Sequence, residues 1–281
     1  MRIDAHQHFW KLSRGDYGWL TPELGLIYRD FSPDDLRPIL RRHKIDTTIL
    51  VQAAPSIFET EYILDIAHHT DFVAGVVGWA DFEAADAAEV IGRLATREPL
   101  VGLRPMIQDI PDPEWMLRPN LAPAIAEMER GDLCFDALLK PPHLAPFQKF
   151  LRKYPNLPIV VDHGAKPEIR NGRFEDWAPS MREMARDERV YCKMSGLVTE
   201  ANSDWKLDDL RRYIDHLLAC FGPERLMWGS DWPVVNLAGG YDRWMDASLV
   251  CLSPLSDAER AAIFGETAAR FYGRGGVSSF V

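Results

Sequence analysis

The sequence has no apolar run long enough to cross a bilayer, and no charged segment followed by an apolar stretch opens it. We therefore expect no membrane partner and an N-terminus that begins inside the fold. Its four cysteines are far apart and show no Cys-x-x-Cys spacing, so neither a disulfide framework nor a zinc–cysteine site is indicated. A reducing, cytoplasmic setting is expected.

The chain also lacks the positive charge that nucleic-acid binding needs. Its formal net charge is −10 and its pI is near 5.3, whereas phosphate backbones are bound by basic surfaces. We therefore expect no nucleic-acid partner. An anionic small molecule is still compatible with this charge, because the local charge of a site matters more than the total. With 281 residues, of which 47% are hydrophobic and 26% charged, the chain is long enough to bury a sizeable core.

Short apolar runs alternate with helical patterns along the whole chain. Several runs, such as Ile159-Val160-Val161, are apolar at nearly every position, which is typical of strands buried on both faces of a parallel sheet. Strands are predicted at residues 3–7, 47–52, 72–78, 100–104, 133–139, 158–163, 190–195 and 225–229. Helices are predicted at residues 59–70, 84–96, 121–130, 145–154, 177–186, 207–221, 241–250 and 257–272.

Strand–helix units repeated eight times over about 250 residues predict a (β/α)₈ barrel, here a single α/β domain spanning residues 1–281. A doubly wound sheet is the alternative, but no Gly-x-Gly-x-x-Gly turn follows an early strand. Residues 10–42 are predicted to be a long insertion after the first strand, able to form a lid over the barrel mouth. The tail 273–281 is expected to fray.

The first predicted strand ends in His6-Gln7-His8. Side chains on a strand alternate between faces, so Asp4, His6 and His8 are expected on one face. Two imidazoles and a carboxylate are costly to bury unless each has a hydrogen-bond partner, a proton or a metal. Solvated histidines at a loose N-terminus are the alternative interpretation.

Other polar residues stand at the ends of the predicted strands, where barrel enzymes carry their active sites. They are Gln52, Arg104, Asp136, Lys140, His163, Lys193, Ser195 and Asp231. Because these strand ends would converge on one bowl, together they are a stronger signal than any single motif. The bulky aromatics Trp10 and Trp232 lie beside this set; a place in the core is the default for such residues, and a wall of the pocket is the functional interpretation.

Structural roles remain open for several of these residues. Asp231 can cap a turn, His163 can be a hydrogen-bonded core histidine, and Arg104 can form an ion pair at the rim of the barrel. Lys193 points outward if the predicted strand is out of phase by one residue. Asp162 directly precedes His163, so on a regular strand it faces the opposite way, in the outer layer.

Four segments resemble the amidohydrolase superfamily and, within it, the branch of sugar-lactone hydrolases. They are IDAHQHFW at 3–10, DHGAKP at 162–167, CKMSGL at 192–197 and WGSDWP at 228–233. The resemblance implies a (β/α)₈ barrel that opens a lactone such as L-fucono-, L-rhamnono- or galactono-lactone. It also implies that Asp231 is the general base, with His6, His8 and His163 around the carbonyl group.

One departure from the superfamily concerns the metal. Members with a firmly bound metal usually carry a histidine at the end of strand five, and none stands between Phe135 and Lys140. With some lactonases of this branch working without a metal, we expect that no cofactor is required. The alternative is one divalent ion such as zinc, held by His6, His8 and Asp231.

Arg104 and Lys193 are predicted to hold substrate oxygens, and Trp10 and Trp232 to provide an apolar patch. A single arginine at the strand ends favours a neutral sugar lactone over a dicarboxylate lactone. Two other classes of function remain open: a metal-dependent decarboxylase or lactone isomerase on the same barrel, and a non-catalytic barrel that binds sugar acids. A homo-oligomer also remains open.

Overall fold

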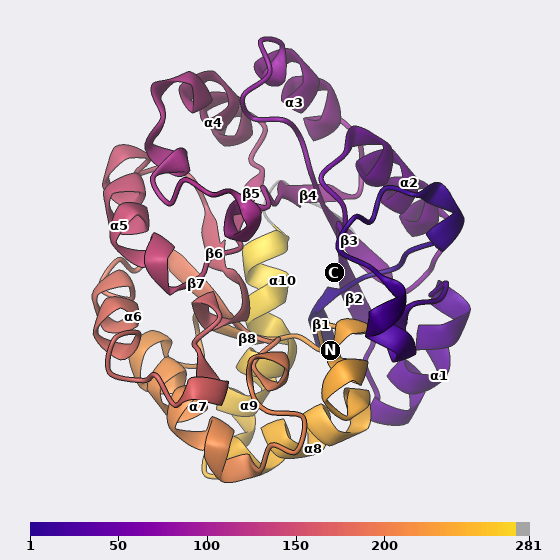
Figure 1. Cartoon of the computed structure of the whole chain (residues 1–281), viewed down its shortest axis with the longest axis vertical. Helices are drawn as coiled ribbons and strands as arrows, with labels where there is room; N and C mark the ends of the chain where they lie inside the picture. The colour runs from indigo at the N-terminus through magenta and orange to yellow at the C-terminus, as the bar shows by residue number, and fades with distance from the viewer. Residues whose placement is uncertain (274–281) are drawn as a thin grey trace.

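The computed structural model describes residues 1–273, and residues 274–281 of the predicted tail lie outside this range. Eight parallel strands pair in sequential order, β1 to β8, and an isolated bridge joins Gln7 of β1 to Trp232 in the segment after β8. The helices surround this ring (Figure 1). The predicted (β/α)₈ barrel is therefore confirmed. Among residues 1–273, no helix is long and apolar enough to span a bilayer.

All eight predicted strands are present, with ends that differ by a few residues. The strands are β1 (Ile3–Gln7), β2 (Thr47–Val51), β3 (Val73–Gly78), β4 (Leu100–Leu103), β5 (Cys134–Ala137), β6 (Ile159–Val161), β7 (Val190–Met194) and β8 (Leu226–Trp228). The helices are α1 (Pro33–His43), α2 (Ile57–His68), α3 (Ala87–Ala95), α4 (Ala122–Arg130), α5 (Leu144–Lys153), α6 (Ala178–Met184), α7 (Leu207–Phe221), α8 (Gly240–Cys251), α9 (Asp257–Ala261) and α10 (Thr267–Tyr272). A short π-helix at Ala262–Glu266 joins α9 to α10.

The predicted insertion 10–42 is too long, because its last third is the barrel helix α1. Ser32 precedes the helix and forms a reciprocal capping box with Asp35, while Pro33 occupies the first turn, where a missing N–H costs nothing. Ser-Pro-Asp-Asp was thus a readable start signal. The true insertion ends near Phe31 and contains only short 3₁₀ turns at Leu12–Arg14 and Pro22–Ile27.

Two apolar layers hold the barrel together. The larger one lies between the strands and the surrounding helices. The smaller one fills the barrel near the N-terminal ends of the strands, where α10 lies across the opening at the centre of the ring in Figure 1. Its members are Ile3, Ala5, Ile49, Val51, Val77, Val101, Cys134, Val160, Met227, Ala268, Phe271 and Tyr272. Side chains near the other end of the strands are therefore left to form the site.

The face predicted for the first strand is broken by an irregularity in β1. Ile3 and Ala5 belong to the inner layer, so they point into the barrel. The pairing of β1 with β2 shifts register after Asp4, and His6 also points inward directly after Ala5. Asp4 lies on the outer side, close to the Tyr241 hydroxyl of α8. The expectation that Asp4 shares a face with His6 is therefore wrong.

A buried carboxylate ties the insertion to the barrel. Glu59 of α2 is fully buried; it accepts a hydrogen bond from the Ala53 amide at 3.0 Å and one from the Tyr17 hydroxyl at 2.8 Å. Arg14 approaches the same carboxylate at 3.4 Å. Because Ala53 follows β2 while Tyr17 and Arg14 belong to the insertion, Glu59 fixes the two segments to each other.

The buried carboxyl group of Glu59 should make the free energy of unfolding depend on pH. Burial raises the pKa of Glu59 to about 7, so between pH 4.5 and 7 the folded chain keeps a proton that the unfolded chain has lost. The free energy of unfolding should therefore fall as the pH rises from 5 to 7, by up to about 3 kcal/mol relative to Glu59→Gln, which does not titrate. Denaturant unfolding of both proteins across this range checks the prediction, and a constant difference between them would contradict it.

Candidate active site

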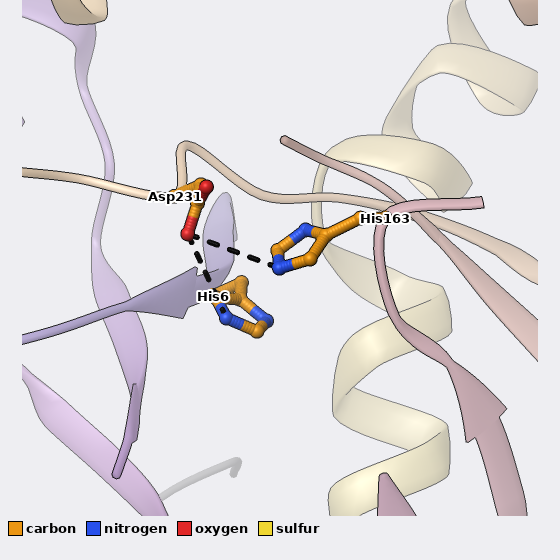
Figure 2. Close-up of side chains that lie close together, drawn as sticks. All are labelled: His6, His163 and Asp231. Carbon is orange, nitrogen blue, oxygen red and sulfur yellow. Dashed lines mark ion pairs between the residues drawn. The ribbon is translucent and has the colours of Figure 1, made fainter. Parts of the chain in front are cut away.

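One carboxylate oxygen is the meeting point of the four predicted catalytic residues. Asp231 Oδ1 lies 3.3 Å from His8 Nε2, 3.8 Å from His6 Nε2 and 3.9 Å from His163 Nε2. Figure 2 shows one Asp231 oxygen joined by dashed lines to His6 and to His163, whose rings lie beside each other. All four side chains are buried. They come from the ends of β1, β6 and β8, so the barrel closes these distant segments onto one point.

The loop after β8 is built to present Asp231. Asp231 adopts a left-handed backbone conformation, with φ of 58°, and its amide donates to the His6 carbonyl at 2.8 Å. The amide of Ser230 donates to the Asp4 carboxylate at 2.8 Å, so Asp4 holds the loop from the outer side. A side chain at Gly229 would come within 2.8 Å of His6 Cβ, which explains why the Trp-Gly-Ser-Asp sequence needs glycine there.

His163 follows a sharp turn rather than a strand. β6 ends one residue before Asp162, and His163 has a φ of 54°. Asp162 continues the inward face of Val160, and the turn brings His163 to the centre as well; the expectation that Asp162 faces the outer layer is wrong. His163 Nδ1 lies 2.8 Å from Ser195 Oγ, and a side chain at Gly196 would collide with this imidazole.

A charged layer lies directly beneath His6. The Lys193 ammonium is completely buried and lies 2.6 Å from Asp136 Oδ2, 3.0 Å from Asp162 Oδ1 and 3.1 Å from His6 Nδ1. The Tyr272 hydroxyl of α10 also donates to Asp136, at 2.8 Å. Lys193 therefore points inward, as predicted, but does not line the pocket; the structure places it under a catalytic candidate rather than against a ligand.

Arg104 combines both roles that its position in the sequence allowed. Its guanidinium donates to the Gln52 carbonyl and lies 3.4 Å from Asp162 Oδ2, as a structural ion pair does. The same group lies 3.3 Å from His6 Nε2 and lines the pocket. Arg104 thus connects the charged layer to the cavity above it.

The predicted aromatic wall is made by a different tryptophan. Trp10 and Trp232 are buried, pack against Phe31 and are not part of the pocket lining; the Trp10 indole donates to the Arg29 carbonyl at 2.7 Å. Trp19, from the insertion, lines the pocket instead. The Trp- and Tyr-rich composition of the insertion was a signal for such a residue, although it could not indicate which one.

The cavity above Asp231 has a volume of about 230 Å³. Besides His8, Arg104, His163 and Asp231, it is lined by Trp19, Ala53, Met106, Gln108, Asp109, Leu138, Lys166 and Val234. Sequence reasoning missed these eight. Lys166 could have been found, because it belongs to the Asp-His-Gly-Ala-Lys-Pro segment. The others lie on loops whose path the strand pattern does not determine.

The residues present can form a metal site. His6, His163 and Asp231 each offer a ligand atom, and these atoms lie within 4.8 Å of one another. Zinc holds nitrogen and oxygen ligands at about 2.0–2.2 Å, so the three side chains would have to draw slightly closer together. His8 adds a further reason: its Nδ1 must donate to the Val51 carbonyl, 2.7 Å away, and its Nε2 then faces a carboxylate oxygen. A proton or a cation at Nε2 satisfies both atoms.

Two neighbouring cations oppose a metal ion at His6. The Lys193 ammonium faces His6 Nδ1 and the Arg104 guanidinium faces His6 Nε2. Both repel a divalent ion, although the carboxylates of Asp136 and Asp162 offset part of their charge. A neutral imidazole has only one unprotonated nitrogen, and a neighbouring N–H donor competes with a metal ion for it. The donor set is therefore right for one divalent ion, while this competition at His6 favours loose binding.

Burial controls the protonation of the site. It lowers the pKa of His163 to about 4, so His163 is neutral at neutral pH. Burial alone would raise the pKa of Asp231, but the charge of His163 and a hydrogen bond from His8 lower it well below its ordinary value. Above pH 4 the contribution of a charged His163 disappears, whereas the contact with His8 remains. Asp231 is consequently an ionised carboxylate at neutral pH, available to accept a proton.

A (β/α)₈ barrel with three histidines and an aspartate gathered at the carboxyl ends of its strands has the organisation of a barrel enzyme. Residues 3–274 match the family model described as Amidohydrolase, and the chain belongs to this amidohydrolase family.

The similar proteins include two curated lactonases. The chain is 46% identical to the L-fucono-1,5-lactonase of Burkholderia ambifaria, over 96% of this chain and 95% of that one. It is 38% identical to the L-fucono-1,5-lactonase of Burkholderia multivorans, over 97% and 96% of the two chains. A solved structure of an amidohydrolase from Burkholderia multivorans with bound zinc is 36% identical, with a TM-score of 0.90 over 97% of this chain and 99% of that one.

Proposed function

We propose that this chain hydrolyses a sugar lactone, of the L-fucono-1,5-lactone type, to the open aldonate. The convergence of three imidazoles on one ionised carboxylate oxygen, at the floor of a small pocket, carries the proposal. The full-length similarity to two L-fucono-1,5-lactonases supports the choice of substrate. A neutral sugar lactone also fits a pocket whose charged lining residues include both signs, Arg104 and Lys166 against Asp109.

Asp231 acts as the general base in this proposal. It takes a proton from a water molecule as the water oxygen adds to the lactone carbonyl carbon, a contribution of about 10²–10⁴ in rate. The oxyanion that forms is stabilised by hydrogen bonds from His6, His8 and His163, and one such donor contributes about 10²–10³. The bond between the carbonyl carbon and the ring oxygen then breaks, and protonated Asp231 returns its proton to the departing hydroxyl.

The buried neighbours act through these residues. Lys193 and Asp162 hold the His6 imidazole from below, so we assign Lys193 a positioning role rather than the substrate contact predicted from the sequence. Arg104, which faces both His6 and the cavity, keeps its predicted role in holding substrate oxygens. The charged layer thus orients the His6 imidazole, while the Val51 carbonyl and Ser195 hold His8 and His163.

A divalent ion, when bound, would be held by His6, His163 and Asp231 and would polarise the carbonyl group as a Lewis acid. Because Lys193 and Arg104 flank His6, we predict that turnover does not depend on it. Dialysis against a chelator should leave kcat/KM within about threefold, with metal content measured by elemental analysis before and after. A loss of more than tenfold that zinc restores would establish an essential ion.

The function is tested with a panel of sugar lactones and a pH indicator, since each hydrolysis releases a proton. L-Fucono-, L-rhamnono- and galactono-lactones should acidify the solution, and NMR should show the open aldonate. Release of CO₂ would favour a decarboxylase, and migration of the ring without opening would favour an isomerase. Tight binding of lactones without turnover would identify a non-catalytic barrel.

We further propose a cytoplasmic location, because the four cysteines are far apart in the sequence and show no spacing typical of a disulfide framework.

A further inference from the structure

One wall of the pocket comes from outside the catalytic constellation. Trp19, on the insertion between β1 and α1, lines the cavity and keeps 37% of its surface exposed, whereas Trp10 and Trp232 are buried. Ala53, Met106, Leu138 and Val234 provide the other apolar side chains of the lining. A ligand that covers this aromatic ring in the pocket removes apolar surface from water, which favours binding.

The Trp19 ring is held in one orientation. Its indole N–H donates to the Ala53 carbonyl at 2.7 Å, and its ring meets Trp10 edge to face, with centroids 5.4 Å apart at 88°. Because the only polar atom of the side chain is already hydrogen-bonded, the indole has no polar group left to offer a ligand. Its remaining exposed surface is an apolar, electron-rich ring.

Ala53, whose carbonyl accepts the hydrogen bond from Trp19, is itself held by Glu59. The Ala53 amide donates to one Glu59 oxygen, and the Tyr17 hydroxyl, two residues before Trp19, donates to the other. Arg14 approaches the second oxygen. Glu59 therefore fixes both partners of the hydrogen bond between Trp19 and Ala53. It holds the residue after β2 whose carbonyl accepts from the indole, and it holds the part of the insertion that carries Trp19.

We propose that Trp19 is a specificity-determining residue that packs against the C–H face of a six-membered sugar lactone, and that Glu59 is its positioning residue. This inference rests on the proposed lactonase function. An apolar ring favours a lactone with a face of C–H groups and a deoxy methyl substituent over one with an additional hydroxyl group. The insertion, rather than the barrel strands, then selects the substrate, while Asp231 and the histidines perform the reaction.

Kinetics of four variants test the proposal, with L-fucono-lactone and galactono-lactone as substrates. Trp19→Ala should raise KM for L-fucono-lactone about tenfold and leave kcat within threefold, while Trp19→Phe keeps most of the affinity. Glu59→Ala should raise KM in the same way, and Glu59→Gln, which can still accept from Ala53, should restore it. The matched control is Phe58→Ala, an aromatic residue that is 80% exposed and outside the pocket lining.

A second measurement does not depend on turnover. In protein labelled with 5-fluorotryptophan, the ¹⁹F line missing from Trp19→Phe belongs to Trp19, and it should shift when L-fucono-lactone or its aldonate is added. An unchanged KM in folded Trp19→Ala, together with a Trp19 line that does not move, would overturn the inference. Absence of turnover by the wild-type chain on every lactone would instead overturn the proposed function, even if the line shifts.

Discussion

Asp231→Asn should lower kcat for lactone hydrolysis by about 10²–10⁴, the range expected when a general base is removed. The amide is nearly the same size as the carboxylate but cannot take a proton from water. The backbone contacts that hold the loop, from the Asp231 amide to the His6 carbonyl and from Ser230 to Asp4, do not involve the altered atom. The fold should therefore persist, and steady-state kinetics with a thermal melt measure the two effects separately.

The matched control is Asp242→Asn on helix α8, an exposed aspartate that pairs with His43 and Arg42 and is not part of the pocket lining. It removes one negative charge without touching the site, so turnover should stay at the wild-type level. If Asp231→Asn retains more than a tenth of wild-type kcat, Asp231 is not the base, and activation of the water must come from elsewhere in the pocket.

Lys193→Met should be the most destabilising single change in the site, costing about 3–5 kcal/mol of unfolding free energy. The substitution leaves the carboxylates of Asp136 and Asp162 facing each other without the ammonium that lies 2.6 Å and 3.0 Å from them. Since both are completely buried, water cannot replace the lost partner. Urea denaturation with a two-state fit measures the loss.

A second substitution separates charge from packing. Asp162 still pairs with Arg104 in Lys193→Met, whereas Asp136 loses its cationic partner. Adding Asp136→Asn removes that unpaired charge, so the double variant should regain stability relative to Lys193→Met alone. Lys140→Met serves as the control, because the side chain of that exposed lysine donates to the Gln108 carbonyl at 3.1 Å and is not part of a buried ion pair among residues 1–273. A loss below about 1 kcal/mol for Lys193→Met would mean that the buried layer carries no strong ion pair.

The barrel could be predicted from the sequence because its signals are local and repeated. Runs such as Ile159-Val160-Val161 are apolar on both faces, as strands enclosed by helices must be. The carboxyl ends of such parallel strands lie at the same end of the barrel, so the sequence alone predicts that Asp231 and the histidines lie together. One helix start, Ser32-Pro33, was present in the sequence but obscured by the long aromatic segment before it.

The failures lie where the backbone leaves regular geometry. A strict period of two misplaces Asp4 relative to His6 because β1 contains a register shift, and misplaces Asp162 because the chain turns at His163 with a positive φ. Neither irregularity has a signature in residue type alone. The choice of Trp19 over Trp10 depends on the path of a loop, which is determined by tertiary contacts such as those of Glu59 rather than by propensity.

The hydrogen bond from Tyr272 to Asp136 connects α10, the last helix within residues 1–273, to the candidate site at the opposite end of the barrel. α10 seals the lower opening with apolar side chains, yet this one hydroxyl reaches the charged layer that supports His6. A deletion that removes Tyr272, or an exchange of α10 with the helix of a relative, would thus alter the support of His6 as well as the folding of the barrel. Tyr272 therefore has to be kept in any shortened or fused form of this protein.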